Sequence, residues 1–176
     1  MGKIRKPTKV KIFASIIFQE GVDLDAVIAN LVQAIGPVEE MTPATLFTHT
    51  TYYDREMGHG LKRFFVLFEP LIERDILSDI KIITNEIEDS HSRNDLRTVN
   101  IDSGYIALEH VILATTKGYA HRLYIGKGIH GDLTLMYLSG SYRTLEWTYP
   151  DYAEPDTVAL FNRWRESCKI SLREGK

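Results

Sequence analysis

Apolar positions in the first third of the chain follow first a strand-like and then a helix-like period. Residues 8–18 alternate or run apolar and include β-branched residues, which predicts a half-buried or central strand. Residues 24–35 carry apolar side chains at helical spacing, with Asp23 placed to cap the helix and Gly36-Pro37 placed to end it. Isoleucines recur every three or four positions over about 73–88, which predicts a second amphipathic helix.

Two aromatic and β-branched segments, 45–53 and 62–68, are separated by a glycine-containing turn at 58–60 and predict a β-hairpin. A further short strand is predicted at 96–101. The order strand–helix–strand–strand–helix–strand is typical of ferredoxin-like folds. We therefore expect an α+β fold with a ferredoxin-like β-α-β-β-α-β core at about 8–101.

The segment that follows this core has an ambiguous period. Residues 104–116 fit a helix that begins after Asp102-Ser103, which we slightly favour, but the run 111–113 favours a strand. Three further strands predict a C-terminal β-meander, because glycine-containing turns separate the segments 121–125, 129–138 and 141–147. The meander would extend the main sheet or pack beside it.

A final helix is predicted over about 156–173, with Pro155 near its first turn. The meander and this helix would occupy about 102–173. Because 176 residues is close to the usual length of one domain, we expect a single domain over 1–176.

Composition narrows the class of protein. The chain is 44% hydrophobic and 26% charged with a net charge of −3, which indicates a globular protein and no general nucleic-acid binding. No apolar stretch approaches the roughly 18 residues of a membrane helix. The apolar run at 12–18 has no signal-peptide cleavage pattern after it, so we expect a cytoplasmic protein. The single cysteine, Cys168, excludes an intrachain disulfide and, on an apolar helical stripe, predicts a buried thiol.

The common nucleotide and metal motifs are missing from the sequence. Gly126-Lys127-Gly128 lies between predicted strands and is followed by Ile129 instead of Ser or Thr, so it reads as a turn and not as a phosphate loop. There is no GxGxxG and no HExxH motif. His49-Thr50-Thr51 supplies one half of a two-motif phosphoesterase pattern whose second half is missing.

Polar functional groups are concentrated in residues 100–152. Asp102 stands at a predicted strand end, where it could either cap a helix or belong to a site. Lys117, His121 and Arg122 are close in sequence and could bind a phosphate or carboxylate. On one strand, however, His121 and Arg122 would point to opposite faces unless a bulge intervenes.

Aromatic residues are mixed with acids in two strings, 51–58 and 147–152. In one interpretation, rings such as Tyr52 and Trp147 form a stacking wall for a base or sugar. In the other, the rings cover the sheet ends as packing lids and Asp151 caps the final turn.

Four ordered motifs, TYYDREMG, NIDSGY, LATTKGYAHRLYIGKGI with the following GDLTLMY, and WTYPDY, together resemble a family of uncharacterised prokaryotic proteins. That family is known only as a domain of unknown function, and its members are often labelled GTP-binding, although this sequence has no conventional GTPase element. Members often have proline where Ser103 stands, so a rigid turn is less assured here. The resemblance implies no reaction. It marks the positions Tyr52, Tyr53, Glu56, Asp102, Gly104, Tyr105, Lys117, His121, Arg122, Trp147 and Asp151.

Two hypotheses follow. In the first, the protein binds or processes a phosphorylated or other anionic small molecule such as a nucleotide, with Asp102, His121 and Glu56 as catalytic candidates. A divalent cation such as Mg²⁺ would bind the acidic groups. The ligand-binding candidates are Lys117, Arg122, Tyr52, Tyr105, Trp147 and Asp151. In the second hypothesis the chain is a non-catalytic module that assembles into a homo-oligomer through its aromatic strings and sheet edges.

Overall fold

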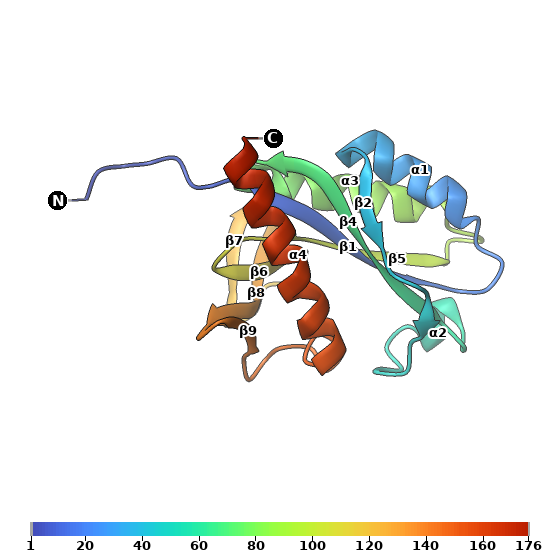
Figure 1. Ribbon diagram of the computed structural model, residues 1–176. Helices are drawn as coiled ribbons and strands as arrows, with labels where there is room; N and C mark the ends of the chain where they lie inside the picture. The colour runs from blue at the N-terminus through green and yellow to red at the C-terminus, as the bar shows by residue number, and fades with distance from the viewer. Residues whose placement is uncertain (1, 176) are drawn as a thin grey trace.

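A computed structural model describes residues 2–175 as a large antiparallel sheet with helices on both of its faces (Figure 1). Within those residues the sheet has nine strands in the order β2-β4-β1-β5-β6-β8-β7, with β3 beside β4 and β9 beside β8. The elements are β1 (Val10–Phe18), α1 (Leu24–Ile35), β2 (Val38–Met41), β3 (Thr45–Leu46), α2 (Asp54–Met57), β4 (Lys62–Ile72), η1 (Arg74–Ile76), α3 (Leu77–Ser90), β5 (Val99–Ile106), β6 (His110–Thr115), β7 (Arg122–Gly126), β8 (Ile129–Leu138), β9 (Ser141–Thr144) and α4 (Pro155–Glu174).

The core lies on both sides of the central strand β1, all of whose residues are buried. Side chains such as Ile12 and Ile16 pack with α1 and α3 on one face. On the other face Phe13 packs against Phe161 and Trp164 of α4. A strand buried on both faces needs a continuous apolar sequence, which is the pattern of residues 10–18.

Several sequence predictions are confirmed. The helix over 24–35 has the predicted bounds, and the Asp23 side chain accepts a hydrogen bond of 3.1 Å from the Ala26 amide. The strand at 129–138 also has the predicted bounds. Pro155 lies in the first turn of α4, and Cys168 lies on the buried face of the same helix. Among residues 2–175, no helix combines the length and the apolar character needed to span a membrane.

The slightly favoured helix at 104–116 is wrong. Those residues complete β5 and form β6, which pairs with both β5 and β8. The apolar run 111–113, with the β-branched Val111 and Ile112, decides the outcome, because this strand lies inside the sheet with Val111 and Leu113 buried. NIDSGY is therefore part of a strand and not a turn, and Ser103 is buried in it.

The predicted hairpin of 45–53 with 62–68 is confirmed only in part. Pairing is limited to Thr45 with Arg63 and Leu46 with Lys62, and Asp54–Met57 forms the short helix α2. The predictions also lacked β2, whose exposed and half-buried residues alternate over only four positions. The meander extends the main sheet, because β8 pairs along β6 and carries β7 and β9 on its far side.

Neighbouring strands β5 and β6 separate along their length. They pair only from Gly104 to Ile106, whereas β5 pairs with β1 along all of its residues. Gly104 stands where the two strands diverge, and a Cβ atom there would lie 2.4 Å from the Ile112 carbonyl oxygen and 2.8 Å from the Phe13 ring. The close approach requires glycine at this position. Beyond it, residues 99–103 have an edge that no strand within residues 2–175 covers.

Candidate functional site

A cleft of about 760 Å³ lies where β5 and β6 diverge. This volume is within the range of small-molecule sites, about 300–1,000 Å³. Its walls come from β5, from the end of β6 and the loop after it, from α3, and from the segments before α2 and α4. The polar and aromatic side chains that line it include Tyr52, Tyr53, Lys81, Glu88, Arg97, Asn100, Asp102, Lys117, Asp132, Tyr149, Asp151 and Tyr152.

The uncovered edge of β5 is closed by side chains of α3. Glu88 accepts a hydrogen bond of 2.7 Å from the Ile101 amide, and Lys81 Nζ donates one of 2.9 Å to the Ile101 carbonyl. Both charged side chains are more than nine-tenths buried. They take the place of a neighbouring strand, which satisfies the main chain without filling the space that a strand would occupy.

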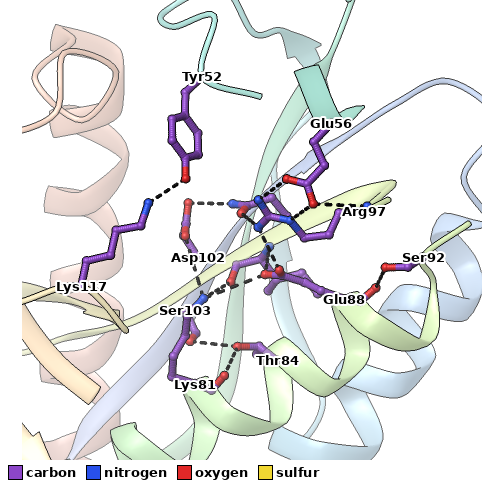
Figure 2. Close-up of polar contacts among 12 residues, drawn as sticks. Tyr52, Glu56, Lys81, Thr84, Glu88, Ser92, Arg97, Asp102, Ser103 and Lys117 are labelled. Atoms are coloured by element: carbon purple, nitrogen blue, oxygen red, sulfur yellow. Dashed lines mark hydrogen bonds and ion pairs between the residues drawn. The ribbon is translucent and has the colours of Figure 1, made fainter. Parts of the chain in front are cut away.

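Arg97 ties the loop before β5 to α2 and α3 (Figure 2). Its guanidinium donates to both carboxylate oxygens of Glu56, at 2.8 and 2.7 Å, and also contacts Glu88 and Asn100. The hydrogen bond from Arg97 lowers the pKa of Glu56. Burial raises the pKa of Glu88 even though Lys81 and Arg97 act in the opposite direction.

Asp102 lies between the walls of the cleft, with its side chain 36% exposed. The Asn100 amide donates to it at 2.9 Å, and Lys81 Nζ is 4.0 Å away. Its negative charge contributes to the raised pKa values of the surrounding Tyr53, Glu88, Tyr149, Asp151 and Tyr152, for each of which burial is the largest cause. A single carboxylate thus faces groups from several separate segments.

Lys117 and Tyr52 meet at the cleft from opposite walls, as Figure 2 shows. Lys117 Nζ donates a hydrogen bond of 2.7 Å to the Tyr52 hydroxyl and lies 4.5 Å from the centre of its ring. Both side chains belong to exposed residues of loops. Among residues 2–175, Lys117 forms no ion pair with a carboxylate, whereas the other cationic side chains at the cleft, Lys81 and Arg97, have acidic partners.

At one wall of the cleft, Asp132 of β8 contacts two basic side chains. Arg122 Nε donates to its Oδ2 atom at 2.8 Å, and His121 Nε2 is 3.3 Å from the same oxygen. The expectation that His121 and Arg122 point apart is wrong, because His121 precedes β7 and does not follow its alternation. Arg122 also donates to the Tyr149 hydroxyl at 2.7 Å, while Trp147 stacks on His121 with ring centres 4.9 Å apart.

The segment before α4 is fixed by a buried ion pair between Asp151 and Arg63 of β4. Asp151 therefore does not cap α4, whose first turn follows Glu154 without a side-chain cap. Burial raises the pKa of Asp151, and the adjacent Arg63 guanidinium opposes that shift. Next to it, the ring of Tyr152 packs on Phe65 and Phe161, which is the lid role expected for this string.

The structure brings part of the predicted site together. Tyr52, Asp102, Lys117 and Asp151 line the cleft. Four other predicted residues lie behind the lining side chains. Glu56 contacts Arg97, His121 and Arg122 contact Asp132, and Trp147 stacks on His121. Tyr105 does not line the cleft and contacts His110 and Arg74 instead. Asp102 lies within β5 and caps no helix.

The basic side chains of residues 117–127, which include the predicted anion-binding residues Lys117 and Arg122, are largely neutralised. Arg122 pairs with Asp132, and Lys127 pairs with Asp79 of α3. Of the lysine and arginine side chains in this segment, only that of Lys117 has no acidic partner among the residues that the structure describes. Within the same residues, no three His, Cys, Asp or Glu side chains are placed so that they could hold a metal ion.

The charged residues Lys81, Glu88 and Arg97 are among the cleft residues that sequence reasoning missed. Lys81 and Glu88 read as the solvated side of an amphipathic helix. Their seven-residue spacing was an available signal, because it places opposite charges two turns apart on one helix face. Arg97 lies in a polar loop, and nothing in the local sequence sets it apart.

Comparison with known proteins gives a family but no relative of known activity. No curated protein and no solved structure matches the chain significantly. Residues 8–168 match the family model described as Domain of unknown function (DUF4416). That match covers most of the 176 residues. The chain therefore belongs to the DUF4416 family.

Proposed function

We propose that the cleft binds a small anionic molecule of about nucleotide size, a phosphorylated compound in particular. The observation that carries the proposal is the Lys117 ammonium, which faces the cleft with a tyrosine as its only polar side-chain partner among the described residues. An ammonium group can contact a phosphate or carboxylate without breaking an existing ion pair. By contrast, Arg122 is held by Asp132 and Tyr149 and supports the wall.

Aromatic side chains support the same proposal. Tyr52 is exposed beside Lys117, and Tyr149 lines the cleft on the side of Asp132. Such rings offer flat surfaces on which a base or another ring can stack. The acid placed to take a proton from a bound molecule is Asp102, so hydrolysis or transfer should be assayed alongside binding.

The experiment is a thermal-shift and calorimetric screen of the wild-type protein with nucleoside mono-, di- and triphosphates, with and without Mg²⁺. A ligand present at 100 times its Kd stabilises the folded protein by about 2.7 kcal/mol. Lys117→Met should weaken the binding of any hit about tenfold or more, since a hydrogen bond to a charged group is lost. Lys62→Met, which changes an exposed lysine outside the cleft, is the matched control.

Three results would contradict the proposal: no nucleotide binds, Lys117→Met leaves the affinity unchanged, or both lysine variants weaken binding equally. Equal weakening would mean that only the overall charge matters. Full loss with Lys117→Met alone supports contact between Lys117 and the anion.

A second candidate function is assembly, and the edge strand β7 favours it. Leu123 is 76% exposed and Tyr124 65%, next to the half-exposed Ile125. In the described part of the chain, no strand covers the outer edge of β7. β7 has a single charged residue, Arg122, whose side chain is held by Asp132, and it has no proline, so few of the features that usually prevent strand pairing are present. Two copies pairing antiparallel about Tyr124 would place Leu123 opposite Ile125 of the other copy on one face.

Sedimentation tests this second candidate. If β7 forms a homodimer edge, the wild-type protein sediments as a dimer and Leu123→Lys sediments as a monomer with an unchanged melting temperature. The exposed Leu138, which lies beyond the residues of β8 that pair with β7, provides the control Leu138→Lys. A wild-type monomer at all concentrations contradicts the assembly proposal.

We also propose that the chain is one domain with a ferredoxin-like unit at its start. In support, β2-β4-β1-β5 are consecutive antiparallel neighbours, and α1 and α3 are the helices that connect them. The sheet continues without interruption into the strands of the meander. Limited proteolysis that releases a stable fragment ending between β5 and β6 would contradict the single domain.

A further inference from the structure

The charges that line the cleft are unequal in number. Its lysine and arginine side chains are Lys81, Arg97 and Lys117, and its acidic side chains are Glu88, Asp89, Asp102, Asp132 and Asp151. Lys81 and Arg97 are held by acidic neighbours, so they offer no free positive charge. A ligand that carried negative charge throughout would therefore meet repulsion away from Lys117.

Three of these five acidic side chains already have an arginine as a hydrogen-bond or ion-pair partner. Glu88 accepts from the Ile101 amide and from Arg97, and Asp151 pairs with Arg63. Asp132 accepts from Arg122 and contacts His121.

Asp102 differs, because within residues 2–175 its only hydrogen bond comes from Asn100 and its nearest ammonium, Lys81 Nζ, is 4.0 Å away. A carboxylate has about four acceptor positions, so Asp102 can accept several more hydrogen bonds.

A second observation points to the same place. The Tyr152 residue is 97% buried and lines the cleft. Its hydroxyl makes no hydrogen bond of ordinary geometry within residues 2–175, with Ser15 as a polar neighbour. The charges of Asp102 and Asp151 both act on this hydroxyl. Buried hydroxyl groups are normally paired, so this one is available to a bound molecule that reaches Asp102.

Building on the proposed function, we infer that the ligand is amphoteric: its anionic group contacts Lys117, and an amino or other cationic group is accepted by Asp102. The two poles lie on different segments of the cleft, Lys117 in the loop after β6 and Asp102 in β5. An organic cation suits Asp102 better than a metal held by the protein alone, because no three metal-binding side chains converge in the described residues. Phosphorylated amines and aminated nucleotides belong to this ligand class.

The test uses two matched series of small probes, ω-aminoalkyl phosphates and the corresponding alkyl phosphates, with chains of increasing length. Affinities are measured by calorimetry for wild type, Asp102→Asn and Lys117→Met. Asp102→Asn keeps the shape of the side chain and its acceptor oxygen while it removes the charge. Asp89→Asn, which neutralises an exposed acid of the same cleft, is the control for overall charge.

We expect the amine to strengthen binding roughly tenfold or more at one chain length, as a charge-assisted hydrogen bond does. This gain in affinity from the amino group should disappear in Asp102→Asn and persist in Asp89→Asn. Lys117→Met should bind both series more weakly but show the same gain. The inference is overturned if the amine brings no gain at any length, or if the gain survives Asp102→Asn. In that case the proposed anion site would still be supported if Lys117→Met weakens the binding of alkyl phosphates. If neither series binds, both proposals fail.

Discussion

Lys81 Nζ of α3 lies 2.9 Å from the main-chain carbonyl oxygen of Ile101 in β5. In a continuous sheet a neighbouring strand would donate to that carbonyl. Because a buried lysine side chain, and not a neighbouring strand, donates to this carbonyl, β5 and β6 lie apart here and leave room for the cleft. Buried charges lose much of their hydration, so a sheet closed by apolar packing would be the more stable arrangement. Buried charges beside a cleft that lower the stability of the fold are typical of a functional site.

Lys81→Met should destabilise the protein by about 3–5 kcal/mol, because it leaves the Ile101 carbonyl without this donor and removes one of the two cations beside the buried Glu88 carboxylate. Adding Glu88→Gln, which removes the carboxylate charge but keeps an acceptor for the Ile101 amide, should recover part of the loss. Urea unfolding of the four proteins of this cycle measures the coupling, which we expect to exceed about 1 kcal/mol. The exposed pair Lys127–Asp79 supplies the control, since Lys127→Met should cost about 1 kcal/mol or less. Additive effects of the two buried changes would contradict the arrangement.

Gly104→Ala should destabilise the protein by about 1–3 kcal/mol or more, because its Cβ would overlap the Ile112 carbonyl and the Phe13 ring. Both neighbours are fixed in the sheet and core. Gly118→Ala is the matched control, because the nearest atom there belongs to the His130 side chain at 3.3 Å. Thermal unfolding of both variants makes the comparison. Equal melting temperatures would mean that β5 and β6 separate more easily at Gly104 than the structure indicates.

Glu56→Gln tests the link from α2 to the cleft through its dependence on pH. Arg97 lowers the pKa of Glu56 in the folded protein below the ordinary 4.5. A lowered folded-state pKa stabilises the protein above the unfolded-state value, and the contribution is lost as the pH falls through the folded-state pKa. At neutral pH the variant should therefore be about 0.5–1 kcal/mol less stable than wild type, since this pair is partly exposed. The difference should vanish in acid.

Glu146→Gln, an exposed glutamate that forms no ion pair among the described residues, should show no such pH-dependent difference. Unfolding curves at a series of pH values give the comparison. A constant gap between wild type and Glu56→Gln down to the lowest pH would exclude the charge on Glu56 as its cause.

Cys168 should react with thiol reagents only when the protein unfolds. The side chain is fully buried, and burial raises the pKa of its thiol, so the reactive thiolate is scarce in the folded state. Labelling with a chromogenic disulfide reagent, with and without denaturant, measures this directly. Rapid stoichiometric labelling of the native protein would instead place the thiol in an accessible site.

Sequence periodicity predicted the elements whose environment is uniform. Residues 24–35 have one buried face and a capping residue, and the strand 129–138 is bounded by glycine turns, so local signals were sufficient. Residues 110–115 were ambiguous because a strand covered on both sides loses the alternation that distinguishes it from a buried helix. Residues 45–53 read as one strand because they are aromatic and β-branched, but the strand there is limited to Thr45–Leu46. The rings of Tyr52 and Tyr53 contact each other, and that of Tyr53 contacts Phe47.

The candidate site was predictable only where charged residues stand within or next to apolar strand sequences. Asp102 and Lys117 stood out for that reason. Lys81 and Glu88 did not, because a helix in isolation gives no sign that one of its charged faces will replace a missing strand. The pairing of Arg122 with Asp132 depends on the register of β7 against β8, so the neutralised charge of the 117–127 segment was not visible in the sequence.

The most direct test of the ligand-binding cleft is a map of amide chemical shifts during titration of the wild-type protein with the best ligand of the nucleotide screen. The account predicts that the largest changes fall on residues 50–53, 100–103, 113–117 and 149–152, which surround the cleft. In Lys117→Met these changes should require a much higher ligand concentration. Changes confined to the β7 edge, or scattered over the surface without saturation, would contradict a binding site between β5 and β6.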